Sequence, residues 1–286
     1  MNLKYLIPTM QKERISNSVY VFTSDLYAKV TACVILTSEG VVLFDTLAFP
    51  VETLKMKQFV EQRLKMPVRY IINSHFHADH TTGNCLFEDV TIISHRACRD
   101  LLNSRGRESL KRAQENDPEL DDIRIILPHE VFDDHINLKI GNKVFELRAS
   151  PGHSEDSIVC HLVDEQILFA ADTVLPVPYF VDGSYNELLC SVQRLQNMNF
   201  DVIVQGHGEI ILRGEIESRL QSDLDYLNTL SLLVNRALAS ENPDQLLKTI
   251  DIESCGKSRV VLNGLAEQLH QRNVTTLSDI RRRDNN

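Results

Sequence analysis

The stretch His75-Phe76-His77-Ala78-Asp79-His80 carries four side chains that can bind metal. It follows an apolar run at residues 68–73, which is typical of a buried strand. Because side chains two apart on an extended segment point to the same side, His75 and His77 can hold one ion together. Imidazole nitrogens and carboxylate oxygens are donors that zinc and related first-row metals accept. The run therefore predicts a metal site directly after a strand.

Three further candidate ligands come after other expected strands. They are His153 in Ser150-Pro151-Gly152-His153-Ser154, Asp172 in Ala170-Ala171-Asp172-Thr173, and His207 in Gln205-Gly206-His207-Gly208. Loops at strand ends carry many binding sites, and the neighbouring glycines allow tight turns that aim the side chains inwards. Ordinary polar turns would explain single histidines but not this pattern. The sequence therefore predicts one closed site.

The rest of the chain divides into two strand-rich halves. The first half has β-rich runs at residues 19–23, 32–37 and 41–45, helical spacing at 50–66, a strand at 90–94 and a polar helix from 96 to about 115. The second half has strand patterns at residues 131–132, 136–140, 143–149, 157–163, 166–171 and 202–205. A helix is expected at 186–197. Two sheets packed face to face, with helices outside, would accommodate this order.

A long helix is expected from residue 215 to about residue 240. Its leucine stripe must be covered, and we expect it to pack on the main core, with a homodimer surface as the alternative. Two short helices and a charged end follow. We therefore expect a domain at residues 1–213 and a helical C-terminal extension at residues 214–286.

Composition narrows the class of protein. A formal net charge of -10 argues against a nucleic-acid partner, because phosphate backbones are held by clustered Lys and Arg. The six cysteines show no CxxC pairing, which indicates reduced thiols and a cytoplasmic location. Residues 1–10 lack the pattern of an export signal, and no apolar run approaches the roughly 20 residues that span a bilayer. We expect no membrane association.

At the ligand motifs the sequence resembles the metallo-β-lactamase fold superfamily. These binuclear metallohydrolases include glyoxalase II, acyl-homoserine lactonases, some β-lactamases and transfer-RNA-processing nucleases. The resemblance covers residues 19 to about 213. It implies an α+β fold, a four-layered αβ/βα sandwich with the metals at one edge, here followed by the helical C-terminal extension.

The resemblance also assigns the ligands to two metal ions. The first ion would be held by His75, His77 and His153. The second would be held by Asp79, His80 and His207. We expect zinc at both positions, with iron or manganese as alternatives.

Two acidic residues complete the set that the resemblance implies. Asp172 would bridge the two ions, and Asp45 would support the loop of metal-binding histidines. Relatives depart from the pattern: di-iron flavoproteins carry an acidic residue at the position of His77, persulfide dioxygenases use part of the set for one iron, and familiar β-lactamase subclasses lack the bridging aspartate. Having Asp172 places the chain nearer the thioesterase and lactonase branches.

The predicted activity is hydrolysis of a small-molecule carbonyl compound by a hydroxide that bridges two metal ions. An ester, thioester, lactone or amide would serve as substrate. Asp79 would orient the attacking water and pass its proton on, and Tyr179 and Tyr185 are candidates for a hydrogen bond to the substrate oxyanion. Lys257 and Arg259 could reach an anionic substrate, as basic residues of glyoxalase II do, but a solvated basic pair is favoured.

Two other activities stay open on this scaffold. A phosphodiesterase or nuclease is disfavoured by the acidic charge. An iron-dependent oxygenase or redox protein, such as a persulfide dioxygenase, would contain iron and consume oxygen.

Overall fold

The first half of the chain forms a seven-stranded mixed sheet whose strands follow the order of the sequence. The computed structural model describes residues 10–284. The strands of the first sheet are β1 (Gln11–Arg14), β2 (Val19–Thr23), β3 (Thr31–Thr37), β4 (Gly40–Phe44), β5 (Val68–Ile72), β6 (Thr91–His95) and β7 (Glu130–Phe132). Neighbours are antiparallel from β1 to β4 and parallel from β4 to β7. The carboxyl ends of β4, β5 and β6 therefore meet at one edge.

The second half forms a six-stranded sheet in the order β13-β12-β11-β10-β9-β8. Its strands are β8 (His135–Ile140), β9 (Lys143–Ala149), β10 (Ile158–Leu162), β11 (Ile167–Ala171), β12 (Val202–Gln205) and β13 (Ile211–Leu212). All neighbours are antiparallel except β11 and β12. Because these two strands run in parallel, the residues that follow them leave the sheet side by side.

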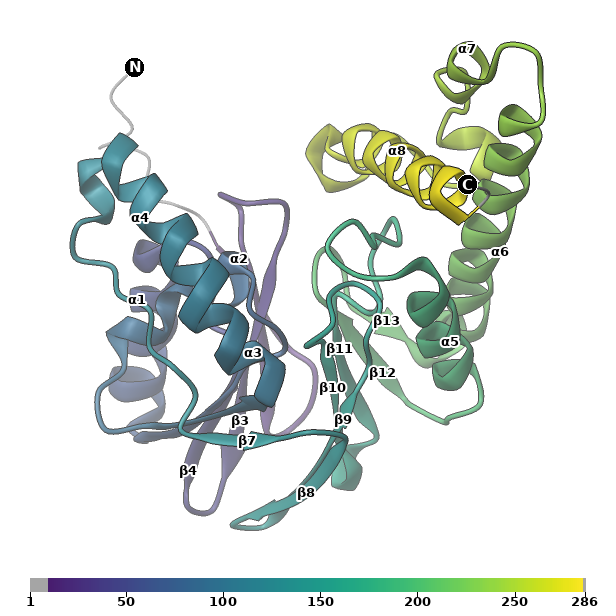
Figure 1. Cartoon of the computed structure of the whole chain (residues 1–286). Coiled ribbons are helices and arrows are strands. Elements are labelled where there is room, and N and C mark those ends of the chain that lie inside the picture. Colours follow the sequence, from purple (N-terminus) through teal and green to yellow (C-terminus); the bar gives the residue numbers. More distant parts are fainter. Residues whose placement is uncertain (1–9, 285–286) are drawn as a thin grey trace.

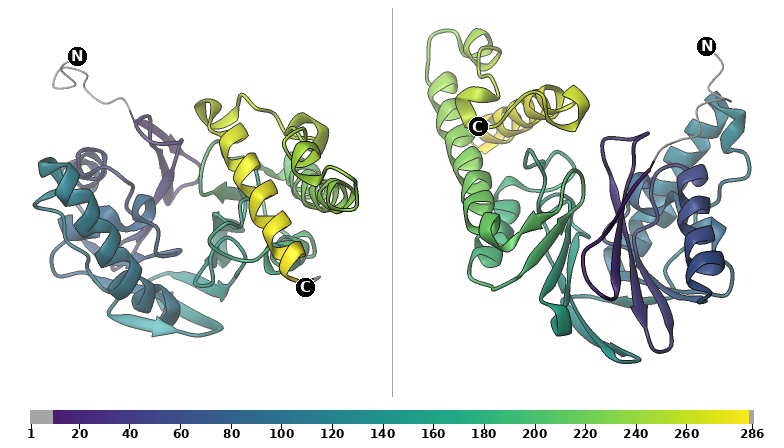
Figure 2. Two further views of the ribbon diagram at one scale, coloured as in Figure 1. Left: turned by 45° about the horizontal axis from the view of Figure 1, so that its top comes forward. Right: turned by 180° about the vertical axis from the view of Figure 1, so that it is seen from behind.

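Helices cover the outer faces of both sheets (Figure 1). On the first sheet lie α1 (Pro50–Gln58) with a π-helical continuation to Leu64, α2 (Ala78–Thr81), α3 (Arg96–Leu101) with a π-helical continuation to Gly106, and α4 (Arg107–Asn116). On the second lie α5 (Tyr185–Gln196) and α6 (Arg213–Leu238), while α7 (Pro243–Leu247) and α8 (Ala266–Asp284) pack against α6 beyond the end of the sheet. Views from two further sides show the same halves (Figure 2).

The core between the two sheets joins the halves. It is built from alternating side chains of both inner faces, such as Phe44 and Phe169, whose rings stack with centroids 5.4 Å apart. A second cluster packs α1 on the outer face of the first sheet, and a third packs α5, α6 and α8 on the second. The expected four-layered αβ/βα sandwich is confirmed.

The apolar stripe of α6 is covered by the chain itself. Leu220, Leu227 and Val234 are buried and belong to the same cluster as Leu188 of α5 and Leu277 of α8. Packing on the core is therefore the outcome for this stripe, and a homodimer stays a prediction. Within residues 10–284, none of the helices combines the length and the apolar character that crossing a bilayer requires.

Candidate metal centre

Four candidate ligands come from the segment that follows β5. His75 lies just beyond the strand and is fully buried, and His77 is the N-cap residue of α2. This helix is a single turn that carries Asp79 and the fully buried His80. The short turn places all four side chains at the same edge of the first sheet.

The other three candidates leave the second sheet at the facing edge. His153 lies in the turn between β9 and β10, Asp172 directly follows β11, and His207 lies two residues beyond β12. Glycine is required beside His207, because a Cβ on Gly206 would collide with Oδ1 of Asp172. The parallel pairing of β11 and β12 thus brings Asp172 and His207 together.

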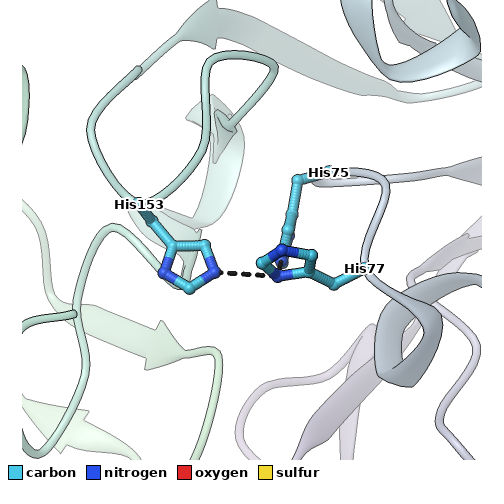
Figure 3. Close-up of side chains that lie close together, drawn as sticks. All are labelled: His75, His77 and His153. Carbon is cyan, nitrogen blue, oxygen red and sulfur yellow. Dashed lines mark hydrogen bonds between the residues drawn. The ribbon is translucent and has the colours of Figure 1, made fainter. Parts of the chain in front are cut away.

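His75, His77 and His153 form the first group of facing donors (Figure 3). Nε2 of His75 lies 2.9 Å from Nδ1 of His77, and this nitrogen lies 3.0 Å from Nε2 of His153. A neutral imidazole has one nitrogen with a lone pair. Lone pairs that face each other at these distances repel unless a proton or a cation lies between them, so the group favours a cation.

Asp79, His80 and His207 form the second group. Oδ2 of Asp79 lies 3.3 Å from Nε2 of His207 and 3.7 Å from Nε2 of His80. Asp172 lies between the two groups, with Oδ1 3.3 Å from Nε2 of His80 and Oδ2 3.2 Å from Nε2 of His153. One carboxylate therefore faces both groups, with a different oxygen towards each.

Each of the five histidines is held from outside by an oxygen atom on its other nitrogen. The contacts are Ser74 Oγ to His75 Nδ1 at 2.9 Å, Asp182 Oδ2 to His77 Nε2 at 3.1 Å, Asp45 Oδ2 to His80 Nδ1 at 2.8 Å, Tyr179 O to His153 Nδ1 at 2.9 Å, and Ala28 O to His207 Nδ1 at 2.9 Å. An oxygen at the outer nitrogen fixes the tautomer and the ring orientation of a metal-binding histidine. The inner nitrogens are left with their lone pairs facing the groups.

Asp45 connects β4 to the loop of histidines. Its backbone φ is 60°, and its carboxylate accepts hydrogen bonds from the Ser74 backbone N–H at 2.8 Å and from the Ser74 hydroxyl at 2.7 Å. The same carboxylate contacts His80 as described above. With this strained backbone, the side chain of Asp45 contacts Ser74 and the outer nitrogen of His80 and does not join the facing donors.

Burial and charge act differently on the histidines. Burial lowers the pKa of His153 to about 4 and the pKa of His75 well below its usual value, so both are neutral at pH 7. Burial also acts to lower the pKa of His207, but the carboxylates of Asp172 and Asp79 together outweigh it and raise the value to about 10. The second group and Asp172 thus attract positive charge, whether it is a proton or a metal ion.

The donor set fits two metal ions of the zinc type. A metal bonded at about 2.0–2.1 Å to tetrahedral ligands separates them by roughly 3.3 Å, and the donor spacings in both groups lie around this value. Nε2 of His80 and Oδ1 of Asp172 are buried and make no hydrogen bond within the part of the chain that the structure describes. Buried polar atoms are normally paired, so these two atoms are explained best as metal ligands.

A cavity of about 670 Å³ opens onto the two groups. Asp79, Asp172 and three histidines line it, and so does Tyr179. Tyr185 does not: it is buried on α5, and its hydroxyl donates to the backbone oxygen of Leu227 at 3.2 Å. The structure therefore brings Tyr179 to the site and leaves Tyr185 in the core, in contrast to the expectation for that residue.

The basic pair near the C-terminus also lies away from the cavity. Lys257 contacts the buried Asp223 with Nζ to Oδ1 at 2.5 Å, and Arg259 pairs with Glu253 at the surface. The basic residue of the C-terminal segment that does line the cavity is Arg272. An anionic substrate in the cavity would therefore meet Arg272, and not Lys257 or Arg259.

Four residues of the site carry no motif in the sequence. Asp182 contacts His77 and also accepts from Arg105, with Oδ1 2.8 Å from the guanidinium nitrogen. Tyr27 and Arg272 line the cavity from the start and the end of the chain. The available signals were weak: Asp182 lies in a turn-forming stretch ahead of Gly183, and Arg272 follows leucines at helical spacing.

A sequence model described as the Metallo-beta-lactamase superfamily matches residues 27–207. The chain is 29% identical over 191 residues to the metallo-beta-lactamase type 2 of Bacillus cereus, a match that covers 63% of this chain and 68% of that protein. It is 24% identical over 144 residues to the beta-lactamase-like protein 2 homolog of Caenorhabditis elegans, covering 50% of this chain. That match spans only 43% of the length of the nematode protein.

Among solved structures, a metallo-beta-lactamase from Pontibacter korlensis superposes with a TM-score of 0.63 at 22% sequence identity. The match covers 77% of this chain and 99% of that one. At this level of identity the likeness establishes the fold.

Proposed function

This chain belongs to the metallo-beta-lactamase superfamily, whose members are typically metal-dependent hydrolases, and from this premise we propose that it hydrolyses a small carbonyl compound with two divalent metal ions. Zinc is the metal that we assign, and an ester, thioester, lactone or amide is the substrate. One observation carries the proposal. Every histidine of the centre turns one nitrogen towards the facing donors while an oxygen holds the other.

In this proposal His75, His77 and His153 hold one ion, and Asp79, His80 and His207 hold the other, in accordance with their grouping. Asp172 offers one oxygen to each. Ions held by these residues would lower the pKa of bound water and polarise the carbonyl under attack.

The protein's own side chains orient the reactants. Asp79 belongs to the second group and also lines the cavity, so in this proposal its carboxylate accepts a proton from the attacking water and returns it to the leaving group. Tyr179 also lines the cavity, and its ring lies 5.9 Å from that of His153, measured between centroids. In this proposal its phenol donates a hydrogen bond to the oxygen that becomes negative during the reaction.

In this proposal two carboxylates also support the metal centre through a histidine ligand. Asp182 fixes the ring of His77 through Nε2, and Arg105 in turn holds Asp182. Asp45 holds His80 and the Ser74 backbone. Carboxylates in such positions orient histidine ligands and raise their basicity.

Metal analysis followed by a substrate panel tests the proposal. We expect two equivalents of zinc in each purified chain, and we expect chelation to abolish hydrolysis and added zinc to restore it. The panel contains thioesters, lactones, β-lactams, phosphodiesters and persulfides, the β-lactams because two relatives are named metallo-beta-lactamases. Full activity in a verified metal-free sample would contradict the proposal. One iron per chain with oxygen consumption would replace hydrolysis with redox chemistry.

A further inference from the structure

The cavity above the metal centre has two apolar walls from distant parts of the chain. Leu110 and Ala113 of α4 line one wall together with Ile123 from the segment that follows. Leu269 of α8 and Leu265, the residue directly before this helix, line the opposite wall. Helices α4 and α8 lie at the same end of the molecule, one on each half (Figure 1). A cavity of this size and lining suits a molecule with a sizeable apolar part.

The apolar lining continues onto the surface beside the cavity. Tyr27 and Phe49 line the cavity, and their rings make an edge contact with centroids 6.5 Å apart. Both side chains remain more than a third exposed, and so do Leu26, Val51 and Leu54 nearby in the chain. Exposed apolar side chains at the mouth of a cavity, such as Tyr27 and Phe49, are where an apolar ligand can bind.

The two arginines of the cavity differ in their partners. Arg105 is neutralised by Asp182 and lies over the ring of Phe76, with 4.9 Å between the guanidinium carbon and the ring centroid. Arg272 is exposed, and within residues 10–284 it makes no ion pair with a carboxylate. Its polar partner is the Tyr179 phenol, whose hydrogen bond raises the pKa of Arg272. A cation without a counter-charge therefore stands beside the metal centre.

Arg272 shares its helix face with the apolar wall. Leu265, directly before α8, and Leu269 and Arg272 within it are spaced four and three residues apart, so they lie in one row at the start of the helix. Tyr179 connects Arg272 to the first group: its phenol hydrogen-bonds to Arg272, and its ring contacts that of His153. A molecule that contacts this row meets apolar groups at one end and a positive charge near the reacting centre at the other.

We propose that the cavity binds an amphipathic acyl compound, with its apolar chain between α4 and α8 and a carboxylate next to the scissile carbonyl held by Arg272. This inference names the substrate class for the hydrolase and so rests on the proposed function. Arginine suits this role because its planar fork donates two parallel hydrogen bonds to one carboxylate. The apolar chain gains affinity from every methylene that it buries.

Binding of N-acylglycines tests the inference, because they place a carboxylate close to an amide carbonyl that bears an alkyl chain. The probes are butanoyl-, hexanoyl-, octanoyl- and decanoylglycine, each compared with its neutral glycinamide by calorimetry on zinc-loaded and zinc-stripped protein. We expect the acids to bind more tightly than the amides in both states. Affinity should rise by up to about fourfold for each added methylene.

The substitution Arg272→Gln separates the charge from the apolar wall. It should weaken the acids by about tenfold to a hundredfold and leave the amides unchanged. Arg272→Lys keeps the charge without the fork and should lose part of the affinity. Arg283→Gln is the matched control, because this exposed arginine lies on the same helix and, within residues 10–284, its guanidinium donates to the Asp279 backbone oxygen.

Three outcomes would overturn the inference: equal binding of acids and amides, an equal loss for both in Arg272→Gln, or no dependence on chain length. Unfolding midpoints of all variants show whether the fold is intact, and a surface substitution such as Arg272→Gln should leave them unchanged. If zinc-loaded protein hydrolyses a neutral ester without preferring acids, this inference alone fails. If it hydrolyses nothing, the proposed function fails, while the binding data still decide the ligand class.

Discussion

The floor of the cavity and its walls hold their side chains in different ways. On the floor, His75 and His80 are fully buried, and an oxygen partner fixes each ring. On the walls, α4 has no buried residue at all, and Arg272 of α8 is exposed. The floor is thus rigid and tolerates little change, whereas the walls can vary without disturbing it. In the proposed function, chemistry and substrate choice would therefore be carried by separable parts of the molecule.

The largest effect should come from Asp172→Ala on the floor. Both groups lose an oxygen at once, so metal affinity should fall by more than about a hundredfold. This loss is larger than the one caused by removing a residue that only supports a metal ligand. Zinc content by mass spectrometry and hydrolysis should fall together. Asp201→Ala is the matched control, because that carboxylate pairs with Arg213 at the surface. A variant with full zinc content would break the assignment of Asp172 to both groups.

A smaller effect is expected from Asp182→Ala, at the boundary between floor and walls. His77 loses the oxygen that holds Nε2, so zinc affinity should fall by about tenfold to a hundredfold. Because Asp182 is partly exposed, the unfolding midpoint of the zinc-free protein should stay the same. Arg105→Ala leaves the contact between Asp182 and His77 in place and should cost less. If the zinc affinity of Asp182→Ala were unchanged, Asp182 would have no role in the metal centre.

The smallest effects should come from a pair of identical substitutions, Tyr179→Phe and Tyr185→Phe. Loss of the cavity-lining phenol at Tyr179 should lower kcat/KM by about tenfold. Loss of the buried phenol at Tyr185 should leave kcat/KM unchanged and lower the free energy of unfolding by about 1 kcal/mol. Steady-state kinetics and denaturant unfolding measure the two effects. Equal kinetic losses would mean that the location of a tyrosine in the cavity does not decide its role.

The same contrast explains how much of the site could be predicted from sequence. The run from His75 to His80 is contiguous. The apolar strand before it indicates that the run lies at the end of a buried strand. Asp172 and His207 follow strands beside glycines, so their local patterns point to one edge, although only the parallel pairing of β11 and β12 brings them together. Local pattern and the family resemblance together predicted the sandwich and the candidate ligands that the structure brings together.

The walls could not be predicted in this way. Whether Tyr179 or Tyr185 reaches the cavity depends on where the loop ends and α5 begins, since the helix carries Tyr185 into the core. Arg272 reaches the cavity because of the way α8 packs over the second half, a matter of tertiary packing that no spacing in the sequence encodes. The exposed strand β1 was also missed, because its four polar residues lack the alternation that marks a strand.

Each group of donors draws on both halves of the chain, and this has a consequence for stability. His153 joins two histidines from the first half, and His207 joins Asp79 and His80. An ion in either group closes a long loop of chain, as a disulfide does, and it binds the folded state alone. If zinc is the ion, as we propose, the free energy of unfolding should rise with the logarithm of the free zinc concentration. A metal-loaded centre would therefore also act as a cross-link between the two halves. Removing the metal with a chelator should weaken the packing of one sheet on the other.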